Sequence, residues 1–359
     1  MGAVLTRATR RGTLAQIRHV TPTHPRDAEG LVAAVYRQVS RDFGILAPPI
    51  ALHSPAPTTL AAAWLMLRET LIATGTTDRV TREAVAAAVS AANDCPYCVD
   101  VHGAMLQGLA GRGTARGVLS GRPGEVADPA LRAVVTWAGG GDQRTPDRPE
   151  AACAELIGVA VAFHYLNRMV NVFLDPSPVP SGVAPRVRDV MFGMAGRLLA
   201  PTARRARPRG AALALLPAAE PGEATAWAAA DPTLRDGFAR AYAAVEAAGE
   251  RSVPSGVRDL VRARLRVWDG KPPGISRAWV EEPLAEIAPP DRAAARLALL
   301  TAVASYQVTT ADIAAVRRGR TPASLVELTS WASLTAATTI GTRLHAPDAA
   351  HRRPWATEH

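Results

Sequence analysis

The stretch Thr81–His102, TREAVAAAVSAANDCPYCVDVH, decides how the rest of the chain is interpreted. Residues 84–92 are a run of strong helix formers, and Asn93-Asp94 then interrupts it with residues that favour turns and helix N-caps. If the aspartate caps a second helix, Cys95 occupies the first position of that helix. Pro96 then lies in the first turn, where a missing N–H costs little. The stretch therefore predicts two consecutive helices joined by a tight turn.

Two of the three cysteines lie in this stretch, and a histidine follows them. Residues three and four apart are neighbours on a helix, so Cys95 should meet Cys98, and Cys98 should meet His102. The thiolate is the reactive form of cysteine, and either a helix N-terminus or a nearby imidazolium lowers a thiol pKa. The helix end favours Cys95 as the reactive thiol, whereas a base one turn away favours Cys98. Glu83, on the preceding helix, is placed to orient His102 or to accept its proton.

This spacing of Glu83, Cys95, Cys98 and His102 resembles the active site of the AhpD-like alkylhydroperoxidases within the carboxymuconolactone decarboxylase superfamily. A second family feature follows at residues 163–168, FHYLNR. The resemblance implies an all-α, AhpD-like helical bundle that reduces hydroperoxides. In such enzymes the second cysteine, here Cys98, attacks the peroxide, and the first, Cys95, resolves it as a redox-active disulfide.

The same resemblance implies that Glu83 and His102 relay the proton and that a dithiol or lipoyl-bearing protein is the reductant. It implies no metal and no cofactor beyond the Cys95–Cys98 disulfide, and a homo-oligomer assembled through helices. One position departs from the best-studied hydroperoxidases, which carry a histidine before the second cysteine. Tyr97 stands there in this chain, as tyrosine does elsewhere in the superfamily.

Three further polar residues, His164, Asn167 and Arg168, are spaced i, i+3 and i+4 and so share one helix face. Two interpretations stay open. Asn167 and Arg168 brace a neighbouring helix, since polar groups on a packed face must find partners. Alternatively, His164 and Arg168 line the approach to the thiols. Together with Tyr97, these three residues are the candidates for a substrate pocket.

Composition bounds the class of protein. With 359 residues the chain is long enough for two domains or for a duplicated one. The net charge is +9, but the arginines are spread along the chain without interleaved aromatic residues, so nucleic-acid binding is not predicted. Neither a membrane span nor an apolar signal segment is evident, and three cysteines do not build a disulfide framework. The predicted location is the cytoplasm.

Loop-forming segments rich in proline and glycine divide the chain into five parts. They are a basic N-terminal arm (1–24), an active AhpD-like repeat (25–175), a Pro/Arg-rich linker with one amphipathic helix (176–225), a degenerate repeat (226–345) and a polar tail (346–359). Helical periodicity begins at Arg26 and is broken at Pro48. It is further predicted over 59–73, 81–92, 95–110, 127–138, 150–174, 186–199, 232–247, 257–268, 307–316 and 327–344.

The second half resembles a diverged copy of the first. When Asp259 is laid on Glu83, Lys271 and Gly274 stand at the cysteine positions and Ala278 at the histidine position. The copy has therefore lost its thiols, and we expect two tandem diverged repeats in which the second packs against the active half and shapes its pocket.

The linker helix, residues 186–199, has Val190, Met191, Met194 and Leu198 on its apolar side. We expect this helix to dock on the other half of the chain or on a second subunit. Binding to a membrane surface is the alternative that its amphipathic pattern leaves open, and membrane association is not predicted.

Ligand count and structural setting separate the rival interpretations of the cysteine pair. Cys95, Cys98 and His102 supply three of the four ligands of a closed zinc site, and His164 is the possible fourth. A thioredoxin-like domain needs a strand before the motif, and none is predicted here. A non-catalytic scaffold is disfavoured because one half keeps all four site residues while the other has lost them. Lactone decarboxylation is disfavoured because classical members of that branch lack the pair.

The resemblance thus implies a thiol-dependent peroxidase. A general thiol-disulfide oxidoreductase of the same fold is the alternative.

Overall fold

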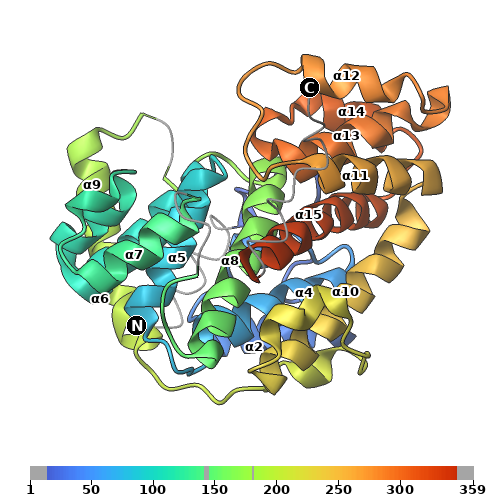
Figure 1. Ribbon diagram of the computed structural model, residues 1–359. Coiled ribbons are helices and arrows are strands. Elements are labelled where there is room, and N and C mark those ends of the chain that lie inside the picture. The colour runs from blue at the N-terminus through green and yellow to red at the C-terminus, as the bar shows by residue number, and fades with distance from the viewer. Residues whose placement is uncertain (1–13, 141–144, 180–181, 346–359) are drawn as a thin grey trace, which may run out of the picture.

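The computed structural model describes residues 14–140, 145–179 and 182–345. Within these ranges the regular structure is helical, and the only bridge of β type is an isolated one between Ile17 and Leu174. The predicted all-α fold is confirmed (Figure 1). The N-terminal arm before residue 14 and the predicted tail after residue 345 lie outside the described residues.

The α-helices are α2 (Gly30–Asp42), α3 (Pro48–Ala51), α4 (Pro57–Leu67), α5 (Arg79–Ala92), α6 (Pro96–Leu119), α7 (Pro129–Ala138), α8 (Glu150–Phe173), α9 (Pro185–Ala203), α10 (Pro232–Ser252), α11 (Ser255–Val267), α12 (Ala278–Leu284), α13 (Arg292–Val303), α14 (Thr310–Arg317) and α15 (Pro322–His345). Short 3₁₀ turns and one π-helical turn, Arg68–Ile72, lie between them.

Helix α8 is the centre of the arrangement, with α5, α6, α7 and α9 on one side and α11–α14 on the other (Figure 1). It contacts α5 and α4 of its own half and α15 of the second half. By length and composition α8 is apolar enough to span a membrane, but 89% of its most apolar window is buried inside the protein. Such burial is typical of the core helix of a globular fold.

The two halves share one core. α15 packs along α8, and α10 packs against α4. α8 and α15 are both 24 residues long and lie beside each other (Figure 1). The second half therefore covers the first, as expected of the degenerate repeat. The exact domain boundaries at 175 and 226 stay a prediction.

Several helix ends differ from the sequence prediction. α2 begins at Gly30 instead of Arg26, because residues before Gly30 turn back on themselves and the Asp27 N–H bonds the His24 carbonyl. α6 continues beyond the predicted end at residue 110. Gly111, with φ +88°, breaks the helix there, and a second helical segment then runs back to Leu119. α13 was missed, although its run of alanine, leucine and arginine favours a helix.

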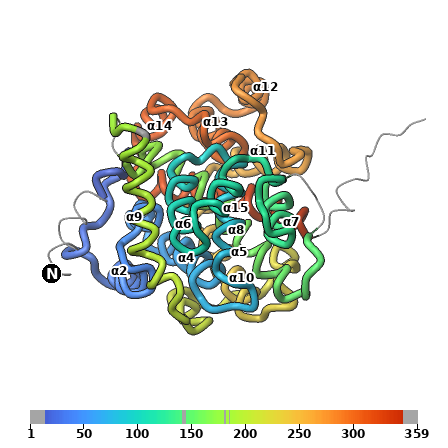
Figure 2. The backbone as a smooth tube through the Cα atoms, turned by 90° about the vertical axis from the view of Figure 1, so that its left-hand side faces the viewer, coloured from blue at the N-terminus to red at the C-terminus, as the bar shows by residue number. Residues whose placement is uncertain are grey.

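Linker helix α9 runs along the outer side of α6 (Figure 2). Its contact is made by small residues, because a Cβ on Gly196 would collide with the Ala104 carbonyl and one on Gly108 would collide with Gly196. The large apolar side chains, predicted to dock on the other half or on a second subunit, point outward, with Met194 56% and Leu198 75% exposed. α9 therefore packs on α6 of the first half through its glycines, which permit a closer approach than the methionines would, and docking of its apolar side on a second subunit stays a prediction.

Candidate active site

The turn between α5 and α6 sets the position of both thiols. Asp94 adopts a left-handed conformation with φ +47°, and the Cys95 N–H donates to the Ser90 carbonyl at 3.0 Å. Cys95 is therefore the N-cap residue and Pro96 the first residue of α6, one position away from the predicted register. The cysteines still lie within the first turn of the helix, three residues apart.

Both cysteines are free thiols and both are buried, Cys95 with 0% and Cys98 with 4% of its surface exposed. Burial raises the pKa of Cys98 well above its ordinary value, and the neighbouring Cys95 raises it further. A hydrogen bond from the Asn167 side chain acts in the opposite direction and favours the Cys98 thiolate. At neutral pH Cys98 is therefore a thiol, and it needs a base before it can act as a nucleophile.

A carboxylate–imidazole pair lies on the same two helices. Glu83 Oε2 is 2.7 Å from His102 Nδ1, and Glu83 Oε1 accepts a bond from Arg79 Nε at 2.8 Å. Burial alone would raise the pKa of Glu83, but Arg79 and then His102 lower it to about 2. Glu83 is thus ionised, and an ionised carboxylate only accepts hydrogen bonds, so His102 carries a proton on Nδ1.

This arrangement leaves the second ring nitrogen of His102 for chemistry. Nε2 makes no hydrogen bond within the described residues, and Phe163 packs edge-on against the ring with centroids 4.6 Å apart. The ring is therefore fixed by Glu83 on one side and Phe163 on the other. A base oriented by a third group in this way is what nucleophilic catalysis requires.

Asn167 joins the thiol turn to α8. Its Nδ2 donates to Ser90 Oγ at 3.0 Å, and its Oδ1 accepts from Asn93 Nδ2 at 3.1 Å. The side chain is completely buried. Because both ends of the amide are bonded to the α5 end and turn, its orientation toward Cys98 is fixed.

Arg168 is buried one residue further on and connects the two halves. Its Nε donates to the Ala302 carbonyl at 2.9 Å, and Nη1 donates to Asn93 Oδ1 at 3.1 Å and to the His164 carbonyl at 2.6 Å. The guanidinium also lies 5.8 Å from the Trp268 ring centroid. Burial lowers its pKa to about 10, so it remains a cation at neutral pH. These contacts are of the kind that the bracing interpretation expects for Asn167 and Arg168.

Tyr97 and His164 are the remaining residues predicted for a pocket. The Tyr97 hydroxyl donates to Gln16 Oε1 at 2.9 Å, and burial raises its pKa. His164 Nδ1 lies 2.9 Å from the Asn93 side-chain amide, and burial together with Arg168 lowers its pKa well below the ordinary value, so the ring is neutral. Tyr97 therefore links the first turn of α6 to Gln16.

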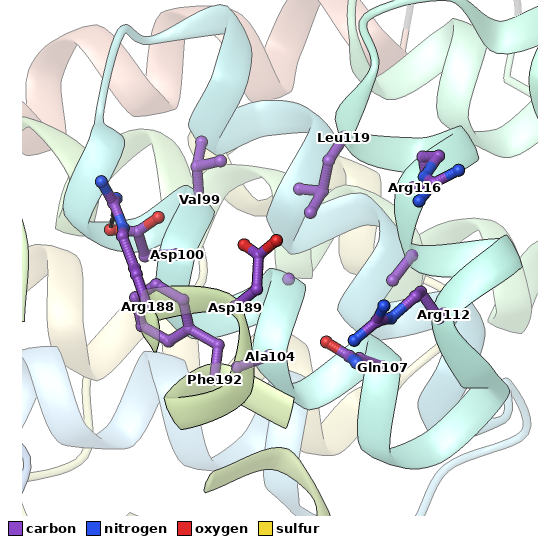
Figure 3. A pocket seen from close by; sticks show the side chains of 12 residues that line it. Val99, Asp100, Ala104, Gln107, Arg112, Arg116, Leu119, Arg188, Asp189 and Phe192 are labelled. Carbon is purple, nitrogen blue, oxygen red and sulfur yellow. Dashed lines mark hydrogen bonds and ion pairs between the residues drawn. The ribbon is translucent and has the colours of Figure 1, made fainter. Parts of the chain in front are cut away.

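A cavity of about 390 Å³ lies on a neighbouring face of α6, between its two segments and α9 (Figure 3). Arg112 and Arg116 stand at one side, with Asp189 near the middle (Figure 3). Its lining residues are Val99, Asp100, Gly103, Ala104, Gln107, Arg112, Ala115, Arg116, Leu119, Arg188, Asp189 and Phe192.

None of the predicted pocket residues lines this cavity. Val99 and Gly103 directly follow Cys98 and His102, so the cavity adjoins the same two turns of α6. Sequence reasoning missed it because it depends on the break at Gly111 and on the docking of α9. The sequence signal for this cavity was Gly111, because a glycine at that point allows the chain to turn between two helical segments.

The zinc alternative depends on convergence of the ligand side chains. Within the described ranges, no three His, Cys, Asp or Glu side chains converge as a metal site would require. His102 uses Nδ1 for Glu83 and His164 uses Nδ1 for Asn93.

An all-helical bundle with a buried Cys-x-x-Cys at a helix start and a Glu–His pair beside it defines an AhpD-like protein. Residues 58–138, which hold all four predicted catalytic residues, match the carboxymuconolactone decarboxylase family. The chain is also 38% identical over 330 residues to a protein of Mycobacterium tuberculosis named alkyl hydroperoxide reductase, covering 91% of this chain and 94% of that relative. The chain therefore belongs to the carboxymuconolactone decarboxylase family as an AhpD-like member. No solved structure matches it.

Proposed function

We propose that this protein is a thiol-dependent peroxidase that reduces organic hydroperoxides at Cys95 and Cys98. The observation that carries the proposal is the buried, ionised Glu83 at 2.7 Å from His102, on the two helices that position the free thiols. The name of the Mycobacterium tuberculosis relative, alkyl hydroperoxide reductase, supports the same activity.

The first step forms a sulfenic acid. His102 Nε2 takes the proton of the Cys98 thiol, directly or through one water, and Glu83 stabilises the resulting imidazolium. The Cys98 thiolate attacks the terminal peroxide oxygen, and the O–O bond breaks. Cys98 becomes a sulfenic acid, and the leaving alkoxide takes the proton from His102 and departs as the alcohol.

The second step forms a disulfide. The Cys95 sulfur attacks the Cys98 sulfur, the S–O bond breaks, and water leaves with the proton of Cys95. A dithiol then reduces the Cys95–Cys98 disulfide and is itself oxidised to a disulfide.

Two observations support Cys98 as the attacking residue. Asn167 donates a hydrogen bond that favours the Cys98 thiolate, and His102 lies one helical turn after Cys98. Cys95 is the N-cap residue and completely buried, which suits a resolving thiol that needs to meet only Cys98.

Burial of both sulfurs also limits the size of the substrate and of the reductant that can reach them. A small hydroperoxide can reach a thiol with 4% exposure after minor side-chain movement, whereas a folded protein disulfide cannot. We therefore favour peroxide reduction over general thiol-disulfide exchange between proteins. For the same reason the reductant should carry its dithiol on a slender arm, as a lipoyl group does.

The test is intact-mass analysis of reduced protein before and after a stoichiometric pulse of cumene hydroperoxide, with zinc assayed on the same samples. Wild type should lose two hydrogens. Cys95→Ser should stop at a Cys98 sulfenic acid that a dimedone probe captures, and Cys98→Ser should not react. Cys153→Ser is the matched control, because Cys153 lies at the start of α8 and its thiol bonds only the nearby carbonyls of Pro146 and Arg148.

Two outcomes contradict the proposal. If the thiols of wild type stay reduced and one zinc is bound per chain, the pair is a metal site. If the thiols stay reduced toward hydroperoxide but are oxidised by a small disulfide such as lipoamide, the general oxidoreductase takes its place.

A further inference from the structure

The cavity between the two segments of α6 and α9 has no part in the proposed peroxidase reaction, because neither the two cysteines nor Glu83 and His102 line it. Its volume of about 390 Å³ is at the low end of the range, roughly 300–1,000 Å³, in which proteins bind small molecules. The break at Gly111 creates this space, since the chain turns there and the second segment of α6 forms one wall (Figure 3). The cavity therefore has the size of a small organic molecule.

Polar side chains gather in this cavity without protein partners. Within the residues that the structure describes, four of them make no side-chain hydrogen bond and no ion pair: Gln107, Arg112, Arg116 and Asp189. The other charged groups of the lining are already satisfied, because Arg188 pairs with Asp100, which also accepts a hydrogen bond from the Ser177 hydroxyl at 2.8 Å. The four unpartnered groups are therefore the ones available to a ligand.

Two of these groups form a positive wall. Arg112 and Arg116 stand one helical turn apart on the second segment of α6, so their guanidinium groups repel each other. An anion bound between them relieves that repulsion, and the planar guanidinium matches the geometry of a carboxylate. The amide of Gln107 adds a neutral donor on the facing segment. This side of the cavity therefore favours a carboxylate group.

The fourth group has the opposite charge. Asp189 comes from α9 and lies near the middle of the cavity, apart from the two arginines (Figure 3). Its carboxylate repels a simple anion and attracts an ammonium group. A ligand with a carboxylate alone would satisfy the arginines but would place a like charge near Asp189. A zwitterion satisfies both sides of the cavity.

The rest of the lining is largely apolar. Val99 lies on the first segment of α6, Leu119 at the end of the second, and Phe192 on α9. All three are half-buried, so an apolar ligand body in contact with them would remove further apolar surface from water. An inorganic ion would make no such contact and would fill little of the volume. The lining therefore fits an organic zwitterion better than an ion.

We propose that this cavity binds a small zwitterion with an apolar body, of which an apolar α-amino acid is the simplest example. The ligand carboxylate lies against Arg112 and Arg116, and the ammonium group lies against Asp189. The apolar body contacts Leu119 and Phe192. The proposal does not rest on the peroxidase function, because the ligand touches neither thiol.

The test is a saturation-transfer difference NMR titration of the full chain with three probes that share one apolar body. L-phenylalanine has both charges, hydrocinnamate lacks the ammonium group, and phenethylamine lacks the carboxylate. L-phenylalanine should bind wild type with a Kd on the order of 0.1–1 mM, as expected for a ligand of this size. The other two probes should bind roughly tenfold more weakly, because each leaves one charged side of the cavity without a partner.

Substitutions test each side of the cavity separately. Arg112→Gln and Arg116→Gln should each weaken binding of L-phenylalanine and hydrocinnamate roughly three- to tenfold, without weakening that of phenethylamine. Asp189→Asn should weaken L-phenylalanine and phenethylamine by a similar factor and strengthen hydrocinnamate, because it removes the like charge. Arg266→Gln and Asp259→Asn, at exposed positions of α11, are the matched controls and should change none of the three. All five side chains are exposed, so the variants should fold, which circular dichroism checks.

Three results would overturn the proposal. Wild type could show no saturable binding of L-phenylalanine. Hydrocinnamate could bind as tightly as L-phenylalanine, with Asp189→Asn affecting neither, which would make the cavity a site for simple carboxylates. Binding that the two arginine variants leave unchanged, or that the controls weaken equally, would place the probe elsewhere.

Cys98→Ser distinguishes this proposal from the peroxidase function. Because Cys98 does not line the cavity, this variant should bind L-phenylalanine like wild type, whether or not wild type reacts with hydroperoxide. Loss of binding in Cys98→Ser would contradict a ligand site separate from the thiols.

Discussion

In both halves of the chain a glutamate near the start of a long helix accepts hydrogen bonds from the segment that precedes another helix. Glu155, near the start of α8, accepts hydrogen bonds from the Thr76 and Thr77 backbone nitrogens at 2.8 and 2.7 Å, just before α5. Glu327, near the start of α15, accepts from the Ser252 hydroxyl, just before α11. When the two halves are aligned with Asp259 on Glu83, Thr76 aligns with Ser252. This shared frame supports the prediction of two tandem repeats.

The halves differ at the proposed site. Glu83 is 1% exposed and bonded to Arg79 and His102, whereas Asp259, its predicted counterpart, is exposed on α11. At the spacings that give His164, Asn167 and Arg168 in α8, α15 carries Ala336, Thr339 and Ile340. The polar brace behind the thiols thus has no counterpart in α15.

The connection after the first helix differs as well. α5 reaches α6 through residues 93–95, while α11 reaches α12 through the loop 268–277, in which Lys271 and Gly274 are exposed. The second repeat keeps the helical fold because it keeps the glutamate at the start of its long helix, Glu327, and its apolar core. The proposed site also has a short turn, buried thiols and a paired carboxylate, which the second half lacks.

The largest expected effect is on His102. His102→Ala removes the base while leaving both thiols, and general acid–base catalysis contributes about 100- to 10,000-fold. The rate of Cys98 oxidation by cumene hydroperoxide, followed by stopped-flow fluorescence, should fall within that range. Imidazole added in solution should restore part of the rate. A rate within twofold of wild type would mean that the Glu83–His102 pair only supports the fold.

The next effect is on the link between the halves. Arg168→Ala leaves the buried Ala302 carbonyl without its donor, which costs about 1–3 kcal/mol, and it also removes the side-chain bonds to Asn93 Oδ1 and to the His164 carbonyl. The free energy of unfolding in urea should drop by about 3 kcal/mol or more. Arg168→Lys should not restore it, because an ammonium does not reproduce the planar fork of the guanidinium.

Arg251→Ala is the control in the second half. Arg251 pairs with Glu327 at 2.7 Å, but its side chain is 55% exposed, so its loss should cost less than about 1 kcal/mol. Equal costs for the two substitutions would show that Arg168 does not join the halves.

A third prediction compares the two acidic residues directly. The pKa of Glu83 falls from 4.5 to about 2 on folding, which corresponds to about 3 kcal/mol of stability. A lowered pKa stabilises the fold above the unfolded value. The contribution is therefore complete above about pH 4.5 and is lost as the pH falls toward 2.

Glu83→Gln should therefore be about 3 kcal/mol less stable than wild type at pH 7, and the difference should shrink in acid. Asp259→Asn, in the exposed counterpart, should stay within about 0.5 kcal/mol at both pH values. Urea unfolding at pH 7 and pH 3 measures both. A Glu83→Gln difference that does not change with pH would mean that lost packing, not charge, explains the cost.

Much of the site could be predicted from the sequence because it is local. Glu83, Cys95, Cys98 and His102 lie on two consecutive helices, and helical spacing alone brings the last three together. The Glu83–His102 contact needed only the assumption that α5 and α6 pack on each other. The one-residue shift at Asp94 was not predictable, since it depends on a left-handed backbone conformation at that residue.

Contacts with distant segments could not be derived from local spacing. The outward orientation of Met194 follows from the glycine contact between α9 and α6, which amphipathic periodicity does not reveal. Likewise, the Tyr97 hydroxyl meets Gln16, and Arg168 meets Ala302, each across more than 80 residues of chain. Such pairs are fixed by the packing of the whole bundle, not by local spacing.

The smallest effect concerns the one hydrogen bond that favours the Cys98 thiolate. Asn167→Ala removes it, which should raise the already elevated pKa of Cys98 further and slow its alkylation by roughly the two- to tenfold that one hydrogen bond is worth, at any pH below that pKa. Peptide-resolved mass spectrometry of iodoacetamide-treated, reduced protein over a pH series measures this. Asn171→Ala is the control, since that amide lies one turn further on α8 and donates to the Asn93 carbonyl and Ser305 Oγ. If both variants slow the alkylation of Cys98 equally, the turn as a whole has shifted, and Asn167 has no separate influence on the thiol.

If only Asn167→Ala slows the alkylation, the polar residues of α8 that α15 lacks affect the reactivity of the thiol as well as the packing of the first half.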